Sequence, residues 1–319
     1  MPMLDMPIEE LKEYMGINPC PEDFDEYWAR ALKELETVDP SVEYIPSNFK
    51  VPYADCFDMY FTGVRGARVH AKCLKPKNVQ KKHPAIIMFH GYRGNSGDWV
   101  EKLPYVAMGF TVVAMDCRGQ GGLSEDVGNN VGTTYGGHII RGLEGSPDDL
   151  MFRHIFLDTA ELAKIVMNME DVDANRVGVT GYSQGGALTI ACAALEPRIK
   201  KIAPVYPFLS DYKRVWQMDL AKDAYEELNY YFRFFDPLHE KEDQVFTKLG
   251  YIDVKNLAKY IKSDVLFTAT LLDNICPPST QFAIYNRLTS TKKLRVYNDF
   301  GHENLPRTND DIFKYMSSL

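Results

Sequence analysis

The residues with the clearest chemical meaning in this chain surround one serine, Ser183. It is the central residue of Gly181-Tyr-Ser-Gln-Gly185, with the apolar run Arg176-Val-Gly-Val-Thr180 before it and an alanine-rich segment after it. We predict a strand, a sharp turn and a helix here, because bulky side chains two positions either side of the strained central residue would collide. The turn would expose the Ser183 hydroxyl as a nucleophile. The pentapeptide alone is weak evidence, and its flanking patterns strengthen it.

A serine hydroxyl needs a base within hydrogen-bonding reach and an acid that orients the base. His302 and Asp273 each follow an apolar run of the kind that forms a buried strand. The order Ser183, Asp273, His302 is the one that α/β-hydrolases use for nucleophile, acid and base. Asp299 is the rival acid, but it stands only three residues before His302, so we expect both on one loop. Asp273 is therefore preferred.

Two backbone N–H groups are expected to bind the oxyanion that forms during attack on a carbonyl. Gln184 is the first residue of the predicted helix, where backbone N–H groups lack partners within the helix. The run His90-Gly-Tyr-Arg-Gly94 follows another predicted strand, and the loop at this position supplies the second donor in such sheets. We expect that donor to be the N–H of Tyr92. His-Gly in this run could instead be only a turn.

A metal site is a competing hypothesis, in which His83, His90 and Asp116 converge. No two of these residues have the spacing of a helical or zinc-finger site. The sequence therefore favours serine chemistry, with no metal and no organic cofactor.

The elements that must position these residues form a regular pattern. Short apolar runs alternate with helical segments, which predicts an α/β fold with a mostly parallel central sheet and helices on both faces. The carboxyl ends of such strands carry the functional loops. The predicted strands are 85–90, 111–116, 176–180, 201–206, 265–272 and 294–297. A hairpin over 56–74, turning at 64–66, is expected to open the sheet.

We predict a single domain over 1–319. Its amino-terminal helical extension covers about 1–50 and includes an amphipathic helix over 22–37. A helical insertion over about 209–262 carries many aromatic residues among charges. We interpret the insertion as a cap or an assembly surface, although aromatic side chains also serve to pack helices onto a core.

Composition and charge exclude several classes of function. The net charge of −8 argues against a nucleic-acid or anionic-membrane partner, since phosphate groups require basic stripes. The first ten residues carry acids where a signal peptide carries bases, and no run approaches the ~20 apolar residues of a membrane span. The six cysteines include no C-x-x-C pair, which fits reduced thiols. We expect a cytoplasmic protein.

Three motifs of the chain form a recognisable set: Arg118-Gly-Gln120, Gly181-Tyr-Ser-Gln-Gly185 and His302-Glu303. With them the chain resembles carbohydrate esterase family seven, the acetyl xylan esterases and cephalosporin C deacetylases of the α/β-hydrolase superfamily. The resemblance implies removal of acetyl groups from acetylated xylo-oligosaccharides and cephalosporin C. It also implies a cytoplasmic, ring-shaped hexamer. Arg93 stands where the resemblance leads us to expect asparagine, which leaves the substrate preference open.

Within this resemblance, Ser183, Asp273 and His302 are the catalytic residues, and Tyr92 and Gln184 form the oxyanion hole. Structural support is assigned to Arg118, Gln120 and Glu303, since a buried charge near a site usually holds a loop through paired hydrogen bonds.

Two alternatives compete with the esterase. A serine peptidase of the prolyl-oligopeptidase type shares the order of the catalytic residues but usually carries a large amino-terminal propeller. A non-catalytic binding module on a hydrolase scaffold is the second alternative, because fold alone does not establish function.

Overall fold

A nine-stranded sheet forms the centre of the described part of the chain, in the order β1-β2-β3-β5-β4-β6-β7-β8-β9. The computed structural model describes residues 4–77, 79, 82–127 and 136–319. The strands from β4 to β9 are parallel to one another, whereas β1, β2 and β3 pair in antiparallel fashion. The bounds are β1 Glu43–Pro46, β2 Ala54–Thr62, β3 Arg68–Pro76, β4 His83–Phe89, β5 Thr111–Met115, β6 Val172–Tyr182, β7 Lys201–Val205, β8 Asp264–Thr270 and β9 Lys292–Tyr297. The expected mostly parallel α/β sheet is confirmed.

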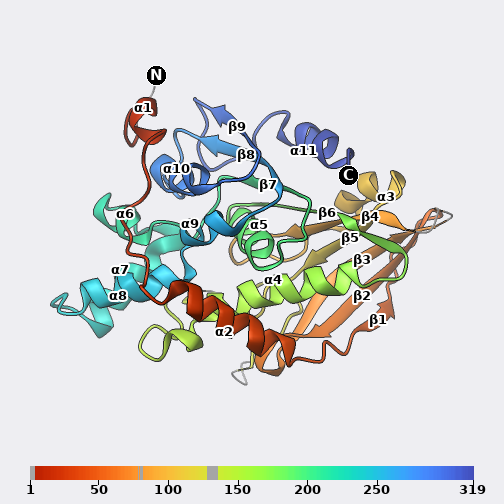
Figure 1. The fold of residues 1–319 in the computed structure, drawn as a ribbon, viewed down its shortest axis with the longest axis horizontal. Helices are drawn as coiled ribbons and strands as arrows, with labels where there is room; N and C mark the ends of the chain where they lie inside the picture. The colour runs from red at the N-terminus through yellow and green to blue at the C-terminus, as the bar shows by residue number, and fades with distance from the viewer. Residues whose placement is uncertain (1–3, 78, 80–81, 128–135) are drawn as a thin grey trace.

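Helices cover both faces of this sheet (Figure 1). On one face, buried side chains of α3 and α11 pack over β4, β5 and β7. On the other face, α5 contacts β4, β6 and β7, and α4 lies beside α5, with α2 packed against α4. The bounds are α2 Phe24–Glu36, α3 Leu103–Ala107, α4 Met151–Met167, α5 Gln184–Leu195, α10 Pro278–Arg287 and α11 Thr308–Met316. The inner parallel strands β4, β5, β7 and β8 are therefore buried on both sides, which explains their nearly continuous apolar sequences, whereas the edge strand β9 is only partly buried.

The amino-terminal region departs from the expected helical extension. It contains the short helix α1 (Ile8–Leu11) and the predicted helix α2, but also the edge strand β1. All four side chains of β1 are exposed, and the strand ends at Pro46. Sequence reasoning missed it because a short strand with no buried face shows no apolar alternation. The predicted hairpin of β2 and β3 is present, with its turn at Val64–Gly66.

Between β7 and β8 the chain passes through the helices of the predicted insertion. They include α6 (Tyr212–Gln217), α7 (Glu226–Phe235), α8 (Glu242–Leu249) and α9 (Val254–Leu257). Five aromatic side chains of the insertion are buried, so they pack these helices together and onto the body of the protein: Tyr212, Tyr225, Tyr231, Phe232 and Phe246. Tyr230, Phe234 and Phe235 are exposed instead, and with the aliphatic Leu238 the last two form an exposed apolar group, in which Phe234, Phe235 and Leu238 have 71%, 55% and 78% of their surface exposed. Among the described residues, no helix is both long and apolar enough to cross a membrane.

Candidate active site

Ser183 lies at a sharp turn between β6 and α5. Its backbone has φ 55° and ψ −118°, a conformation that side-chain-bearing residues seldom adopt. A Cβ atom on Gly181 would come within 2.5 Å of the backbone carbonyl of Gly185, and one on Gly185 would come within 2.2 Å of the Phe89 carbonyl oxygen. The turn therefore requires glycine at both positions, as the sequence predicts. It places Ser183 at the carboxyl end of β6 and at the start of a helix.

The structure brings Ser183, His302 and Asp273 into one hydrogen-bonded row. The Nε2 atom of His302 lies 3.0 Å from Ser183 Oγ, and its Nδ1 atom lies 2.8 Å from Asp273 Oδ2. The other carboxylate oxygen of Asp273 accepts the backbone N–H groups of Ile275 and Cys276 at 2.9 and 2.8 Å. This carboxylate is fully buried and fixed in orientation. His302 therefore carries its proton on Nδ1, which leaves Nε2 free to accept the serine proton.

The loop after β4 is tied to the serine turn by two glutamines. The side-chain amides of Gln120 and Gln184 bond to each other in both directions, at 2.8 and 3.0 Å. Gln120 Oε1 also accepts the backbone N–H of Arg93 at 3.0 Å. Arg93 has φ +62°, a left-handed conformation that asparagine adopts more readily than arginine does. The backbone next to Tyr92 is thus held relative to Gln184, the other expected oxyanion donor.

The family model described as "Acetyl xylan esterase (AXE1)" matches residues 1–319. The chain belongs to the acetyl xylan esterase family. It is similar to the crystal structure of acetyl xylan esterase 1 from Thermoanaerobacterium sp. JW/SL YS485, with 63% identity and a TM-score of 0.96 over 99% of each chain. An acetyl xylan esterase from Paenibacillus sp. R4 is 33% identical, with a TM-score of 0.92 over 98% of this chain and 99% of its own.

A curated relative is longer than this chain. The acetyl esterase Axe7A of Xylanibacter ruminicola is 28% identical over 286 residues, which cover 86% of this chain and 61% of Axe7A. The chain thus spans about three fifths of the length of that relative. Structures of α/β-hydrolases below 25% identity share the fold alone. The expected fold, the α/β-hydrolase fold, is confirmed.

The two charged residues of the acetyl xylan esterase motifs lie in different surroundings. Arg118 is fully buried and forms a paired interaction with Asp158 of α4, at 2.7 and 2.6 Å. It also donates to the Val64 carbonyl oxygen at 3.2 Å, so it connects the loop after β5 to α4 and to the hairpin turn. Glu303 is exposed and accepts the Gly301 N–H at 3.0 Å. The expectation that Glu303 is a buried charge was wrong. Its hydrogen bond to Gly301 stays within one loop, and such a bond does not require burial.

The three residues of the metal hypothesis do not converge. His83 pairs with Thr111, Asp116 pairs with His70, and His90 Nε2 accepts the Cys117 N–H. Their side chains therefore satisfy separate buried polar groups. Burial also lowers the pKa of His90. In the described part of the chain, the one cluster with ligand geometry consists of Asp273, Cys276 and His302, which includes two members of the hydrogen-bonded row.

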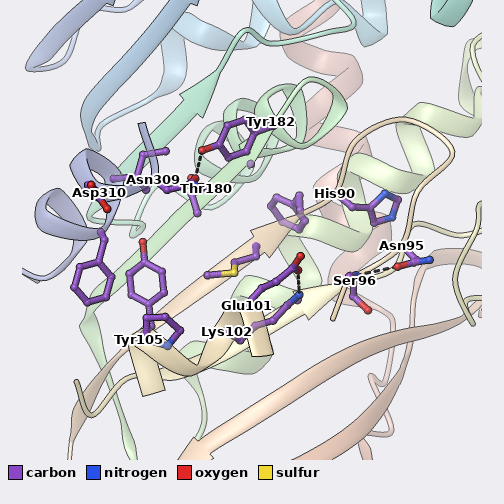
Figure 2. A pocket seen from close by; sticks show the side chains of 18 residues that line it. His90, Asn95, Ser96, Glu101, Lys102, Tyr105, Thr180, Tyr182, Asn309 and Asp310 are labelled. Carbon is purple, nitrogen blue, oxygen red and sulfur yellow. Dashed lines mark hydrogen bonds and ion pairs between the residues drawn. The ribbon is translucent and has the colours of Figure 1, made fainter. Parts of the chain in front are cut away.

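A cavity of about 650 Å³ lies between α3 and α11 (Figure 2). Tyr182, the residue before Ser183, lines it, and its hydroxyl bonds to Asn309. Ser183 and His302 do not line this cavity. It therefore adjoins the serine turn without containing the hydroxyl that would react.

Tyr206 is a neighbour of the acetyl xylan esterase site that sequence reasoning missed. Its ring centroid lies 4.7 Å from that of His302, and its hydroxyl donates to the Glu303 carbonyl oxygen at 3.1 Å. It therefore braces the loop that carries the histidine. Its position at the carboxyl end of the predicted strand 201–206 was the signal that could have identified it.

Proposed function

We propose that this protein is a serine esterase, a carboxylic ester hydrolase that removes acetyl groups from small esters through an acetylated Ser183. The observation that carries the proposal is the unbroken row from Asp273 to His302 to Ser183, with contacts of 2.8 and 3.0 Å. The acetyl xylan esterases to which the chain is similar support acetyl esters as substrates. Acetylated xylo-oligosaccharides and cephalosporin C are the proposed substrate classes.

The first half of the reaction acylates the enzyme. His302 Nε2 takes the proton of Ser183 Oγ as that oxygen attacks the acetyl carbonyl carbon. The buried carboxylate of Asp273 stabilises the resulting imidazolium. The backbone N–H groups of Tyr92 and Gln184 bind the oxyanion, and one such donor typically lowers the barrier by ~3 kcal/mol. When the intermediate collapses, His302 returns its proton to the departing alcohol.

The second half releases acetate. His302 removes a proton from water, and the hydroxide attacks the carbonyl carbon of acetylated Ser183. The same two N–H groups bind the second oxyanion. Collapse breaks the bond to Ser183 Oγ, which recovers its proton from His302. Each cycle consumes one ester and one water and yields one alcohol and one acetate.

We also propose a single-domain, cytoplasmic protein that forms homo-oligomers, hexamers by the family resemblance. Phe234, Phe235 and Leu238 support an assembly surface at the end of α7, because together they expose large apolar side chains. Light scattering coupled to size-exclusion chromatography tests this, and a monomer at micromolar concentration would contradict it.

The enzymatic proposal is tested by initial rates with p-nitrophenyl acetate, butyrate and octanoate, and by acetate release from cephalosporin C. We expect a strong preference for acetate and no activity of Ser183→Ala. Preference for octanoate would contradict acetyl specificity. Hydrolysis of aminoacyl-proline amides would favour the peptidase alternative, and a folded wild type without any hydrolase activity would favour the binding module.

A further inference from the structure

The thiol of Cys276 lies beside the hydrogen-bonded row, and the esterase mechanism does not use it. One ligand atom each of Asp273, Cys276 and His302 lies within 4.8 Å of the other two. Asp273 and Cys276 are fully buried, whereas 21% of the His302 side chain is exposed and leaves a way in for an ion. The Ser183 side chain also hydrogen-bonds to the thiol. Asp273, Cys276 and His302, here named the Cys276 cluster, thus bring a carboxylate, a thiol and an imidazole together next to the nucleophile.

The fold holds the Cys276 cluster in place. Asp273 and Cys276 follow β8, and His302 follows β9, the neighbouring parallel strand (Figure 1). The backbone N–H of Cys276 donates to Asp273 Oδ1 at 2.8 Å, and its carbonyl oxygen accepts Gln281 Nε2 of α10 at 2.6 Å. The other carboxylate oxygen, Oδ2, faces His302 Nδ1 at 2.8 Å. The donor atoms are therefore oriented by hydrogen bonds from behind, as the ligands of metal sites are.

The donor set of the Cys276 cluster suits a thiophilic divalent cation. Thiolate and imidazole ligands select Zn²⁺ and related soft cations, whereas Mg²⁺ and Ca²⁺ take oxygen ligands. At its usual bond lengths, tetrahedral zinc holds such donors about 3.3–3.6 Å apart. The 2.8 Å contact between His302 Nδ1 and Asp273 Oδ2 must therefore widen by about half an ångström. The thiol, within 4.8 Å of both partners, must approach them by no more than about 1.2 Å.

A divalent cation also balances the charge of this buried place. Burial and the Asp273 carboxylate raise the pKa of the Cys276 thiol well above its ordinary value, so the thiol keeps its hydrogen when no cation is bound. Coordination to a metal ion removes that hydrogen. The carboxylate and the thiolate then carry two negative charges, which the ion neutralises, and no net charge is left buried. Binding therefore releases one proton, from Cys276 Sγ, to solvent.

We propose that the Cys276 cluster binds one Zn²⁺ or Cd²⁺ ion and that this ion inhibits the enzyme, an effect that rests on the proposed esterase function. The ion bonds to Asp273 Oδ2, Cys276 Sγ and His302 Nδ1, and water takes the fourth position. The neutral ring then carries its one hydrogen on Nε2 instead of Nδ1. In that tautomer His302 presents a hydrogen to Ser183 Oγ and cannot take the serine proton. Removal of the ion returns the hydrogen to Nδ1, so the inhibition is reversible.

Cadmium absorption measures the binding without reference to activity, because a cadmium–thiolate bond absorbs in the ultraviolet. The protein for this titration is Ser183→Ala, which keeps all three ligands. We expect the absorbance to saturate at one Cd²⁺ per chain. Loss of a residue that only supports a metal ligand already lowers affinity by about 10- to 100-fold. Cys276→Ala in the same background should therefore abolish the absorbance and weaken Cd²⁺ binding, measured by calorimetry, at least about 100-fold.

Cys20→Ser is the matched control, because it removes an exposed thiol outside the Cys276 cluster. We expect this variant, also in the Ser183→Ala background, to keep the cadmium affinity and the absorbance of its parent. A signal that disappears in Cys20→Ser, or that persists in Cys276→Ala, would overturn the proposed site. Saturable cadmium binding at the cluster in a protein whose wild type has no esterase activity would refute only the proposed function.

The inhibition is tested with p-nitrophenyl acetate at controlled Zn²⁺ concentrations, and each variant's rate in excess EDTA is its own reference. We expect Zn²⁺ to inhibit the wild type and Cys20→Ser over the same concentration range, with full recovery on addition of EDTA. Cys276→Ala should need at least about 100-fold more Zn²⁺ for the same fractional loss of rate. Mg²⁺ at equal concentrations should have no effect. Equal sensitivity of the wild type and Cys276→Ala to Zn²⁺ would overturn the proposal, as would a zinc-saturated wild type that keeps its rate.

Discussion

Replacing Asp273 by asparagine should show whether this carboxylate sets the protonation of the catalytic histidine. The N–H groups of Ile275 and Cys276 both donate to Asp273 Oδ1. They would hold the amide oxygen of Asp273→Asn in that place and turn its NH₂ group toward His302. This NH₂ group would donate to His302 Nδ1, so the imidazole would carry its hydrogen on Nε2 instead.

In that tautomer His302 presents a hydrogen to Ser183 Oγ, at a distance of 3.0 Å in the wild type, and cannot accept the serine proton. A wrong tautomer of this kind lowers kcat by about 10⁴-fold. This corresponds to about 5.5 kcal/mol of transition-state stabilisation. The measurement is the initial rate of p-nitrophenyl acetate hydrolysis at pH 7.5, with circular dichroism to show that the variant is folded.

The matched control is Asp299→Asn, which changes an exposed carboxylate three residues before His302. We expect this variant to keep its rate within about twofold, because surface changes away from the contacts seldom matter. The reasoning is refuted if folded Asp273→Asn retains more than about a tenth of wild-type activity. It is equally refuted if Asp299→Asn loses as much activity as Asp273→Asn does.

Three further predictions concern stability, each measured by urea unfolding. Gly185→Ala should destabilise the fold by about 3 kcal/mol, because the new methyl group would collide with the Phe89 carbonyl; an unchanged midpoint would contradict the packing. Arg118→Leu should lower the free energy of unfolding by about 3–5 kcal/mol, because it leaves the buried Asp158 carboxylate without its arginine. The double variant Arg118→Leu/Asp158→Leu should recover part of that loss. Burial raises the pKa of Glu161 to about 7. The folded state then binds more protons than the unfolded state between about pH 4.5 and 7, so the free energy of unfolding falls as pH rises over this range. Glu161→Gln should remove this fall and be more stable than the wild type by about 1 kcal/mol at pH 8. Parallel pH profiles of the unfolding free energy in the two proteins would contradict this prediction.

Much of the candidate site could be predicted because each part has a local signature. Gly181 and Gly185 report a steric requirement that acts over a few residues, and the structure shows the close approaches that cause it. Asp273 and His302 each follow a strand pattern, and the ends of parallel strands gather at one edge of a sheet. Local sequence was therefore enough to nominate the three residues that the structure brings together.

Other features had no local signature. Strand β1 has no buried side chain, so its pairing with β2 depends on the neighbouring strand alone. The exposure of Glu303 depends on how its loop lies on the body. The separate partners of His83, His90 and Asp116 likewise depend on packing, and residue type alone suggested a convergence that does not occur.

The sequence by itself determined the turn at Ser183, the alternation of strands and helices, and the order of the reactive residues, because sterics and hydrophobic periodicity act between near neighbours in the chain. Only the tertiary structure decided which side chains face one another across long separations. His138, Tyr92 and Glu227 illustrate the difference, since the Tyr92 hydroxyl contacts both of the others although Tyr92 and Glu227 stand 135 residues apart. Their meeting depends on how the inserted helices pack over the end of the sheet, which no pattern between near neighbours in the chain can specify.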